Sequence, residues 1–212
     1  MIRVMIVDDH PLVREGLNKV LTKGTIDIAV VGEASNASEL LNMLSKQRPD
    51  IVILDIAMPG RSGMDVLKDV KKLYPQLPVL MLSMHPEERF AVRALKAGAS
   101  GYMTKTSISD ELVSAIRVIV QQKKRYISPE VGEQLAQQID SNNKNTPHEI
   151  LSDREYEVLC MIASGKKVST IAEELSLSVQ TIHTYRARLK DKMNMKSNVE
   201  LARYAIQQDL ID

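Results

Sequence analysis

Four short apolar runs in the sequence lead into residues that could take part in metal or phosphoryl chemistry. The runs are residues 4–7, 51–54, 79–82 and 101–104. The polar residues that follow them are three carboxylates, a hydroxyl and an ammonium: Asp8, Asp9, Asp55, Ser83 and Lys105. Continuous aliphatic runs are typical of strands buried on both faces, as in a parallel sheet. Because parallel strands end at the same edge, where open α/β sheets bind ligands, we expect a site for a divalent cation and a phosphoryl group there.

The chemistry that suits this set is Mg²⁺-dependent phosphorylation of Asp55. A carboxylate attacks a phosphoryl donor without a general base, which fits a set that contains no histidine. Asp8 and Asp9 would hold the Mg²⁺, because this hard cation prefers oxygen ligands and takes few of them from a protein. The cation would offset the repulsion between the carboxylates and the incoming phosphoryl oxygens. Lys105 would pair with the phosphoryl group as a point charge, and Ser83 would donate a hydrogen bond to it.

The alternative for any one of these residues is structural. A lone Asp at the end of a strand is more often a helix cap than a catalytic group, and Asp8 or Asp9 alone would fit that role. The occurrence of every polar group at the same strand end favours the functional interpretation.

Helical patterns alternate with the apolar runs over residues 1–120. The first, residues 11–21, directs Arg14 away from an apolar face. That face consists of Leu12, Leu17, Val20 and Leu21. Asn36 predicts the N-cap of a second helix, with Glu39 at the third helical position, and further patterns cover residues 65–74, 87–97 and 109–120. Five strand-like runs alternating with five helical patterns predict an α/β fold, a doubly wound five-stranded parallel sheet with right-handed crossovers.

The pattern changes after residue 121. A helical segment at residues 128–139 precedes the polar residues 140–147, which are rich in loop formers and predict a linker. Beyond residue 151 we find no strand-like run, only helical patterns at residues 153–163, 168–175, 179–193 and 198–207. We therefore expect a domain at residues 1–121, a linker with a helical segment at 122–147, and an all-α four-helix domain at 148–212.

Two of the late helical patterns, at residues 168–175 and 179–193, predict a helix-turn-helix. The second helix directs Val179, Ile182, Leu189 and Met193 inward. Residues 178–198 carry five basic side chains against one acidic one, a net charge of +4. Such a helix suits the major groove of DNA, with cations on phosphates and the earlier polar residues near base edges, whereas a basic face can also be merely solvated. The candidate DNA-binding residues are Gln180, Thr181, His183, Thr184, Arg186, Arg188, Lys190, Lys192 and Lys196.

Two of these assignments leave alternatives open. His183 either contacts DNA or is an exposed bystander on the helix. The segment 198–207 is a candidate dimer face through Leu201, Ala202, Ala205 and Ile206, but these residues suit a core equally well. Glu155 is expected to pair with a basic residue of its own domain.

Composition bounds the remaining possibilities. The 212 residues are 44% hydrophobic and 26% charged, with a net charge of +1. Because the whole chain is nearly neutral, any nucleic-acid-binding surface must come from a local cluster of basic residues. Cys160 is the single cysteine, so an internal disulfide framework is excluded. We expect Cys160 to be a small buried apolar residue. The start of the chain resembles a strand rather than a signal peptide, and no apolar stretch approaches the roughly 18 residues of a membrane span. We expect a cytoplasmic protein with no membrane partner.

Residues 2–120 resemble the receiver domain of bacterial two-component response regulators, a flavodoxin-like fold. The matching motifs are Asp8-Asp9, Asp55 with Met58-Pro59-Gly60, Ser83, and Lys105 after Gly98-Ala99-Ser100-Gly101-Tyr102. The resemblance implies that Asp55 is phosphorylated, that Asp9 binds the metal directly and Asp8 indirectly, and that the Ala57 carbonyl is a further ligand. It also implies that Ser83 and Tyr102 form a switch pair. The alternative for Tyr102 is an edge aromatic with its hydroxyl in water.

Two further positions bear on the lifetime of an aspartyl phosphate. Ala57 and His85 lie two residues after Asp55 and Ser83, where side chains reach the attacking water. Because Ala57 cannot orient that water, we hypothesise that His85 affects the rate of dephosphorylation.

The C-terminal residues resemble the LuxR-type helix-turn-helix of the NarL/FixJ class of response regulators. The similar segments are residues 151–159, 162–165 and 181–193. Gln180 and Tyr185 depart from the pattern, since the family commonly carries Lys and His there. Gln180 is suited to bidentate reading of adenine. The resemblance implies a sensor histidine kinase and double-stranded DNA as partners, a homodimer when phosphorylated, and RNA polymerase as a further potential partner.

The sequence therefore predicts a phosphorylation-switched transcription factor, not an enzyme. By the resemblance, the unphosphorylated receiver obstructs the DNA helix and phosphorylation releases it. One alternative is a DNA-binding regulator with a vestigial receiver that acts without phosphorylation. The other is a phosphohydrolase of the haloacid-dehalogenase type, whose chemistry usually needs a second Asp where Ala57 stands.

Overall fold

The computed structural model describes residues 1–23, 25–84, 87–129, 131–133, 135, 146–208 and 210–211, with the backbone alone at 87–89 and 109–110. The chain divides into two compact units, Met1–Ala136 and Gln137–Asp212. Of the predicted linker, residues 140–145 lie outside the described residues. Within the predicted segment 128–139, residues 129, 131–133 and 135 are helical.

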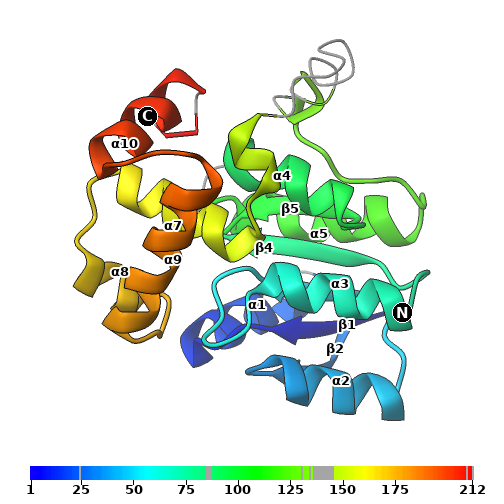
Figure 1. Ribbon diagram of the computed structural model, residues 1–212. Helices are drawn as coiled ribbons and strands as arrows, with labels where there is room; N and C mark the ends of the chain where they lie inside the picture. Colours follow the sequence, from blue (N-terminus) through cyan, green and yellow to red (C-terminus); the bar gives the residue numbers. More distant parts are fainter. Residues whose placement is uncertain are drawn as a thin grey trace. The chain divides into compact units, whose positions relative to one another are not determined.

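The first unit alternates strands and helices along the chain, as Figure 1 shows. Its elements are β1 (Ile2–Val7), α1 (Pro11–Lys23), β2 (Ile28–Ala34), α2 (Ala37–Lys46), β3 (Ile51–Asp55), α3 (Gly63–Leu73), β4 (Val79–Ser83), α4 (Glu87–Lys96), β5 (Gly101–Thr104) and α5 (Ile108–Val120). The five strands form a parallel sheet in the order β2-β1-β3-β4-β5. This is the flavodoxin-like order of a doubly wound sheet, so the predicted fold of this unit is confirmed.

The apolar runs form strands because both of their faces are covered. Every residue of β3 and β4 is buried, and in β1 only Arg3 is exposed. One face of the sheet packs against Leu17 and Leu21 of α1 and against Leu112 and Ile116 of α5. Strands β3, β4 and β5 pair without a register shift, with Asp55 opposite Leu82 and Ser83 opposite Thr104. Their carboxyl ends therefore meet at one edge.

The predicted orientation of α1 is wrong at its first turn. Leu12 is 81% exposed, whereas Leu17 and Leu21 are buried as expected. Arg14, expected to point away, is half-buried, and its guanidinium donates a hydrogen bond of 2.6 Å to the backbone carbonyl of Asp8. The reason is that the first turn of α1 begins directly after the Asp8–Asp9 loop, at the carboxyl edge of the sheet. In the first turn Val13, not Leu12, packs against the core, together with Leu17 and Leu21 of the later turns.

Among the described residues of the second unit, the regular elements are all helices. A short 3₁₀ helix, η1 (Pro147–Ile150), precedes four α-helices: α7 (Asp153–Ala163), α8 (Val168–Glu174), α9 (Val179–Lys192) and α10 (Asn198–Gln207). The predicted four-helix domain is thus confirmed, with α7 packed against α8, α9 and α10. Ile182, Leu189 and Met193 are buried as expected, but Val179 is 46% exposed because it opens the first turn of α9.

None of the helices in the described part of the chain combines the length and apolar character needed to cross a bilayer.

Helix α3 begins in close contact with the end of β3. The amide of Gly63 donates a hydrogen bond of 2.8 Å to the carbonyl of Ile56. A Cβ atom added to Gly63 would lie 1.9 Å from the backbone oxygen of Asp55. The close approach requires glycine, because backbone on both sides leaves no flexible atom to move.

We expect Gly63→Ala to destabilise the protein by about 1–3 kcal/mol, as overpacked sites typically do. The measurement is the free energy of unfolding from urea denaturation. Gly16→Ala is the matched control: Gly16 lies in α1 with nothing within 4 Å of an added Cβ. Because Ala favours a helix interior over Gly by about 0.5–1 kcal/mol, that change should be neutral or stabilising. Equal effects of the two substitutions would contradict the steric explanation.

Candidate functional site

The carboxyl edge of the sheet brings three of the predicted acidic and basic residues into direct contact. Lys105 Nζ lies 2.7 Å from Asp8 Oδ2 and 3.0 Å from Asp55 Oδ2. Asp8 and Asp55 are each 1% exposed, and the Lys105 side chain is 9% exposed. Residues from the ends of β1, β3 and β5 thus form one buried charge cluster, as the sequence predicted.

The cluster holds more negative than positive charge. Burial raises the pKa of Asp55 to about 6, with the Lys105 ammonium acting in the opposite direction and Asp8 adding to the rise. Burial acts to lower the pKa of Lys105, but the Asp55 and Asp8 carboxylates outweigh it and raise that pKa. One ammonium is therefore shared by two carboxylates, with Asp9 beside them. A divalent cation would relieve this excess.

Two buried oxygens of the cluster are open for a ligand. Among the described residues, neither Asp9 Oδ1 nor Asp55 Oδ1 has a hydrogen-bond partner. Unpaired buried oxygens are rare in proteins and often mark an ion or a functional site. Carboxylate oxygens are the ligands that Mg²⁺ prefers, so the residues present fit the predicted cation.

His10 belongs to the cluster, which corrects the expectation that the set contains no histidine. A ring nitrogen of His10 and carboxylate oxygens of Asp8, Asp9 and Asp55 lie within 4.8 Å of one another. The His10 amide also donates a hydrogen bond of 2.8 Å to Asp8 Oδ1. In the sequence His10 follows Asp9 directly, but it lies outside the apolar run that drew attention to the acidic pair.

Ser83 and Ala57 lie at the same edge, whereas Tyr102 lies earlier in β5, opposite Met81. Ser83 is fully buried at the end of β4, and Tyr102 is 2% exposed in the adjacent strand β5. The alternative of a solvent-facing Tyr102 is therefore wrong. Ala57 is half-buried two residues after Asp55. His85 lies outside the described residues.

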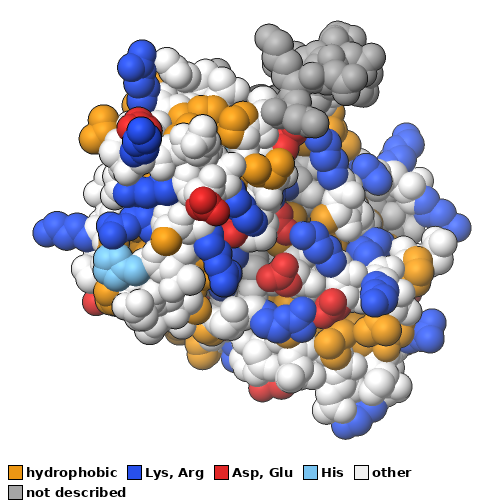
Figure 2. Space-filling model, viewed as in Figure 1, with side chains coloured by type: hydrophobic (Ala, Val, Ile, Leu, Met, Phe, Trp, Pro, Cys, Tyr) orange, Lys and Arg blue, Asp and Glu red, His pale blue; other side chains and the backbone are white. Residues whose placement is uncertain are grey.

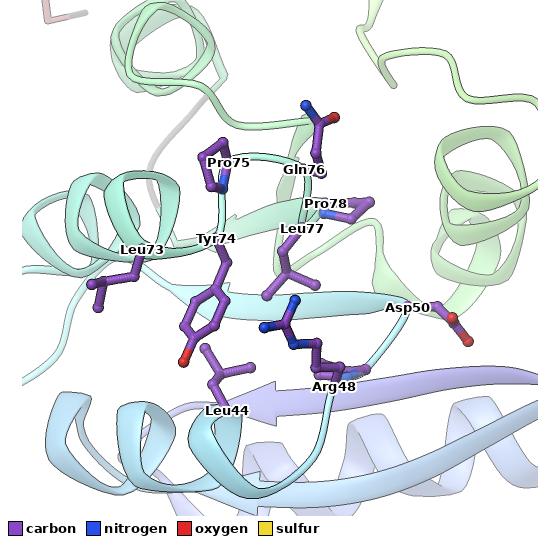
Figure 3. A pocket seen from close by; sticks show the side chains of 10 residues that line it. Leu44, Arg48, Asp50, Leu73, Tyr74, Pro75, Gln76, Leu77 and Pro78 are labelled. Atoms are coloured by element: carbon purple, nitrogen blue, oxygen red, sulfur yellow. The ribbon is translucent and has the colours of Figure 1, made fainter.

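A cavity of the first unit lies at the opposite end of the sheet, away from the acidic cluster. It measures about 390 Å³ and lies between the ends of α2 and α3 and the beginnings of β3 and β4. Figure 3 shows Tyr74, Leu77 and Arg48 around it, with the Arg48 guanidinium 5.4 Å from the centre of the Tyr74 ring. Arg48 is exposed, and among the described residues the one acidic side chain that lines the cavity is Asp50, so we assign no catalytic role to this cavity.

Helix α9 presents the predicted polar face. Figure 2 shows Lys and Arg side chains, with a histidine among them, on the side of the second unit where α8 and α9 lie. Five of the predicted residues are exposed: Gln180, Thr184, Arg188, Lys192 and Lys196. The half-buried members of the predicted set are Thr181, His183, Arg186 and Lys190. His183 is thus neither fully exposed nor buried.

The hydroxyls of the first turns of α9 already have partners within the helix. Thr184 Oγ1 donates to the carbonyl of Gln180 at 3.0 Å, and Thr181 Oγ1 lies 2.8 Å from the Ser178 hydroxyl. The side-chain amide of Gln180 has no hydrogen-bond partner among the described residues. Gln180 therefore keeps its full capacity for hydrogen bonding to a ligand.

Lys192 has a different environment from the other cations of α9. Its Nζ lies 2.7 Å from Glu155 Oε2, and the Glu155 side chain is 4% exposed. Glu155 also closes a capping box with Ser152 at the start of α7. Burial acts to raise the pKa of Glu155, but the hydrogen bonds from Lys192 and Ser152 outweigh it and lower that pKa. The expected basic partner of Glu155 is therefore Lys192, which ties α9 to α7.

Both units match known protein families. Residues 4–117 match the response regulator receiver domain, and residues 149–205 match the bacterial regulatory proteins of the luxR family. Among curated relatives, the response regulator GacA of Pseudomonas viridiflava is 39% identical over 214 residues, covering 100% of this chain and 99% of GacA. The response regulator UvrY of Escherichia coli (strain K12) is 37% identical over 213 residues, covering 99% of this chain and 96% of UvrY.

Solved structures give the same assignment. RcsB of Salmonella typhimurium is 28% identical to this chain and has a TM-score of 0.62. The match covers 96% of this chain and 98% of the RcsB chain. A structure of an RcsB–DNA complex is 29% identical, covers 96% of each chain, and has a TM-score of 0.59. The chain therefore belongs to the NarL/FixJ class of response regulators, in which a phosphorylated receiver domain controls transcription through a LuxR-type DNA-binding domain.

Proposed function

We propose that Asp55 accepts the phosphoryl group from a phosphohistidine of a sensor kinase. A carboxylate oxygen of Asp55 attacks phosphorus, the new O–P bond forms, and the N–P bond to the donor imidazole breaks. The observation that carries this proposal is the buried Asp55 Oδ1, which has no hydrogen-bond partner among the described residues. The nucleophile is held at the end of β3, beside the Lys105 ammonium.

Asp9, Asp55, the carbonyl of Ala57 and, less directly, Asp8 would hold Mg²⁺. Asp8 already accepts hydrogen bonds from Lys105 at 2.7 Å and from the His10 amide at 2.8 Å, whereas Asp9 Oδ1 has none. This difference supports Asp9 as the direct ligand and Asp8 as the outer one. The bound cation would neutralise charge on the phosphoryl oxygens.

Phosphorylation would change the partners of Lys105. A phosphoryl group brings about −1.5 to −2 charges to the site, which gives Lys105 a stronger anion than Asp8. Ser83 and Tyr102 lie in the neighbouring strands β4 and β5, so we propose that a shift of the Ser83 hydroxyl toward the phosphoryl group permits a rotation of Tyr102. We also propose that His85 affects the lifetime of the phosphoryl group on Asp55.

The site is better suited to holding a phosphoryl group than to turning over a phosphomonoester. A phosphohydrolase with an Asp nucleophile needs an acid to protonate the leaving group. The half-buried side chain of Ala57, two residues after Asp55, cannot supply a proton. We therefore propose a switch rather than a hydrolase.

In the second unit, we propose that α9 enters the major groove of DNA. Arg186, Arg188, Lys190 and Lys196 would contact phosphates, and Gln180 would read a base edge with its unpaired amide. Lys192 would contribute less to the phosphate contacts, because its ammonium already pairs with the buried Glu155, although its side chain remains 40% exposed. Thr181, His183 and Thr184 would line the groove beside Gln180.

We propose that the phosphorylated protein acts as a homodimer in the cytoplasm, with RNA polymerase as a further potential partner. RcsB, a structural relative, is described as two dimers bound to two parallel DNAs. On α10, Leu201 and Ala205 are buried in the core, whereas Val199 and Ile206 are 77% and 57% exposed. Of the predicted dimer face, Ile206 is therefore exposed and Ala202 is half-buried, so these two are accessible for a dimer contact. The receiver would span residues 1–121, the linker 122–147 and the DNA-binding domain 148–212.

We expect Asp55→Asn to abolish phosphorylation by a small phosphodonor in the presence of Mg²⁺, because the amide is not a nucleophile for phosphorus. Intact-protein mass spectrometry measures the gain of one phosphoryl group. Asp65→Asn, in the first turn of α3, is the matched control and should be phosphorylated like the wild type. Sustained release of phosphate from a phosphomonoester would contradict the switch. Equal DNA affinity of the wild type and Asp55→Asn, with and without the donor, would favour a vestigial receiver.

We expect the Mg²⁺ affinity of the wild type to fall as the pH drops through about 6. With its pKa raised to about 6, the Asp55 carboxyl is protonated below that pH and cannot bind a cation, whereas a carboxyl at the ordinary value of 3.8 would remain ionised. Calorimetric Mg²⁺ titrations at pH 5, 6 and 7.5 measure the effect. An affinity that stays constant between pH 7.5 and 5 would show that Asp55 is not the titrating ligand.

Gln180→Ala and Arg188→Ala should affect DNA binding differently. Loss of a bidentate base contact should relax discrimination at one base pair by about 1–3 kcal/mol. Loss of a phosphate contact should weaken binding to all sequences and reduce the slope of log K against log salt by about 1. Competition binding on operator variants at several salt concentrations separates the two. A uniform loss for Gln180→Ala would rule out base reading by this residue.

A further inference from the structure

The imidazole beside the acidic pocket has no part in the phosphoryl transfer proposed above. His10 lies in the loop between β1 and α1, directly after Asp9. Its Nδ1 atom is 3.0 Å from Asp9 Oδ1 and 3.3 Å from Asp8 Oδ1. Because a ring nitrogen of His10 also lies within 4.8 Å of a carboxylate oxygen of Asp55, it faces the same space as the three acidic side chains.

The spacing of these atoms fits ligands of one ion. Asp9 Oδ1 is buried and, despite its distance of 3.0 Å from His10 Nδ1, forms no hydrogen bond among the described residues. Two ligand atoms that each lie about 2.1 Å from an ion are about 3.0 Å apart at a right angle and about 3.4 Å apart at the tetrahedral angle that Zn²⁺ prefers. The buried Asp55 Oδ1 is likewise without a hydrogen bond in the described part of the chain. One nitrogen and two unpaired oxygens thus converge.

We infer that His10 supplies a nitrogen ligand that lets this pocket bind a divalent transition-metal ion, such as Zn²⁺, more tightly than its carboxylates alone would. This inference rests on the proposed function only for the location of the Mg²⁺ site. Mg²⁺ takes oxygen ligands and gains nothing from an imidazole. Zn²⁺ and related ions bind imidazole and carboxylate together, and their affinity depends on such nitrogen ligands. Zn²⁺ and Mg²⁺ then compete for Asp9 and Asp55.

A purely structural role of His10 makes a different prediction. The His10 amide and Nδ1 both contact Asp8 Oδ1, at 2.8 Å and 3.3 Å, so the residue also orients this carboxylate. If orientation were its only role, removal of the imidazole would weaken the binding of Zn²⁺ and of Mg²⁺ to the same extent. A nitrogen ligand instead affects Zn²⁺ and leaves Mg²⁺ unchanged. The ratio of the two affinities therefore separates the two roles.

The experiment is a calorimetric titration of the full chain with Zn²⁺ and, separately, with Mg²⁺, for the wild type and His10→Ala. Loss of even an outer partner of a metal ligand typically costs about 10–100-fold in affinity. We therefore expect the Zn²⁺ dissociation constant to rise at least about tenfold and that of Mg²⁺ to change less than about twofold. A change of less than about fivefold in the ratio of the two constants overturns the inference.

Three controls keep the result interpretable. His148→Gln removes an imidazole from the second unit, where it contacts Tyr204, and should leave Zn²⁺ binding at the acidic pocket unchanged. Should His10→Ala fail to fold, His10→Gln repeats the test with a side chain closer in size. Phosphorylation of the wild type in Mg²⁺ is measured separately. Its absence, with Zn²⁺ selectivity retained, would count against the proposed function and not against the role of His10.

Discussion

The burial of like charges at the carboxyl edge of the sheet is the constraint on which the rest of this structure depends. Asp8 and Asp55 are almost completely buried, with Asp9 beside them, yet one ammonium from Lys105 serves both. Isolated buried carboxylates are costly and tend to take up a proton. The pKa of Asp55, raised to about 6 by its burial, reflects this cost. A divalent cation would relieve this cost, whereas a phosphoryl group would add about −1.5 to −2 charges that the cation and Lys105 must then balance. Phosphorylation would therefore change the charge balance of the whole cluster.

The surrounding backbone holds this charge cluster in place. Gly63 lets α3 begin against the carbonyl of Asp55, and Arg14 donates a hydrogen bond to the carbonyl of Asp8 from the first turn of α1. These contacts hold the acidic residues from outside without using their carboxylate oxygens. The oxygens of Asp9 and Asp55 therefore remain available for ligands, which an ordinary well-satisfied core would not permit.

The second unit divides the cations of α9 and of the turn that follows it between two roles. Lys192 pairs with the buried Glu155 and joins the end of α9 to the start of α7. Arg188 and Lys196 remain exposed, as does Gln180 at the first turn. Because the Lys192 ammonium already balances the buried Glu155 carboxylate, a contact of Lys192 with a DNA phosphate would compete with this ion pair. Net charge alone therefore overstates the number of cations that α9 offers to DNA.

The sequence by itself determined the α/β fold of the first unit, the four helices of the second, and the convergence of Asp8, Asp55 and Lys105. These follow from local rules, since apolar runs and helical periodicity identify elements, and parallel strands must end at one edge. The exposure of Leu12 and the contact of the Arg14 side chain with the Asp8 carbonyl could not be predicted. Helical periodicity does not say where α1 begins relative to the edge of the sheet.

The partners of His10 and Lys192 were likewise decided by the tertiary structure. His10 lies outside any hydrophobic pattern, and Glu155 stands 37 residues from Lys192 in the chain. Nothing in local spacing distinguishes Lys192 from Lys190, which is two residues away. Only packing of α9 on α7 brings one of them to a buried carboxylate. The sequence determined which chemical groups this protein has, and the tertiary structure decided which of them are paired and which remain free to bind a ligand.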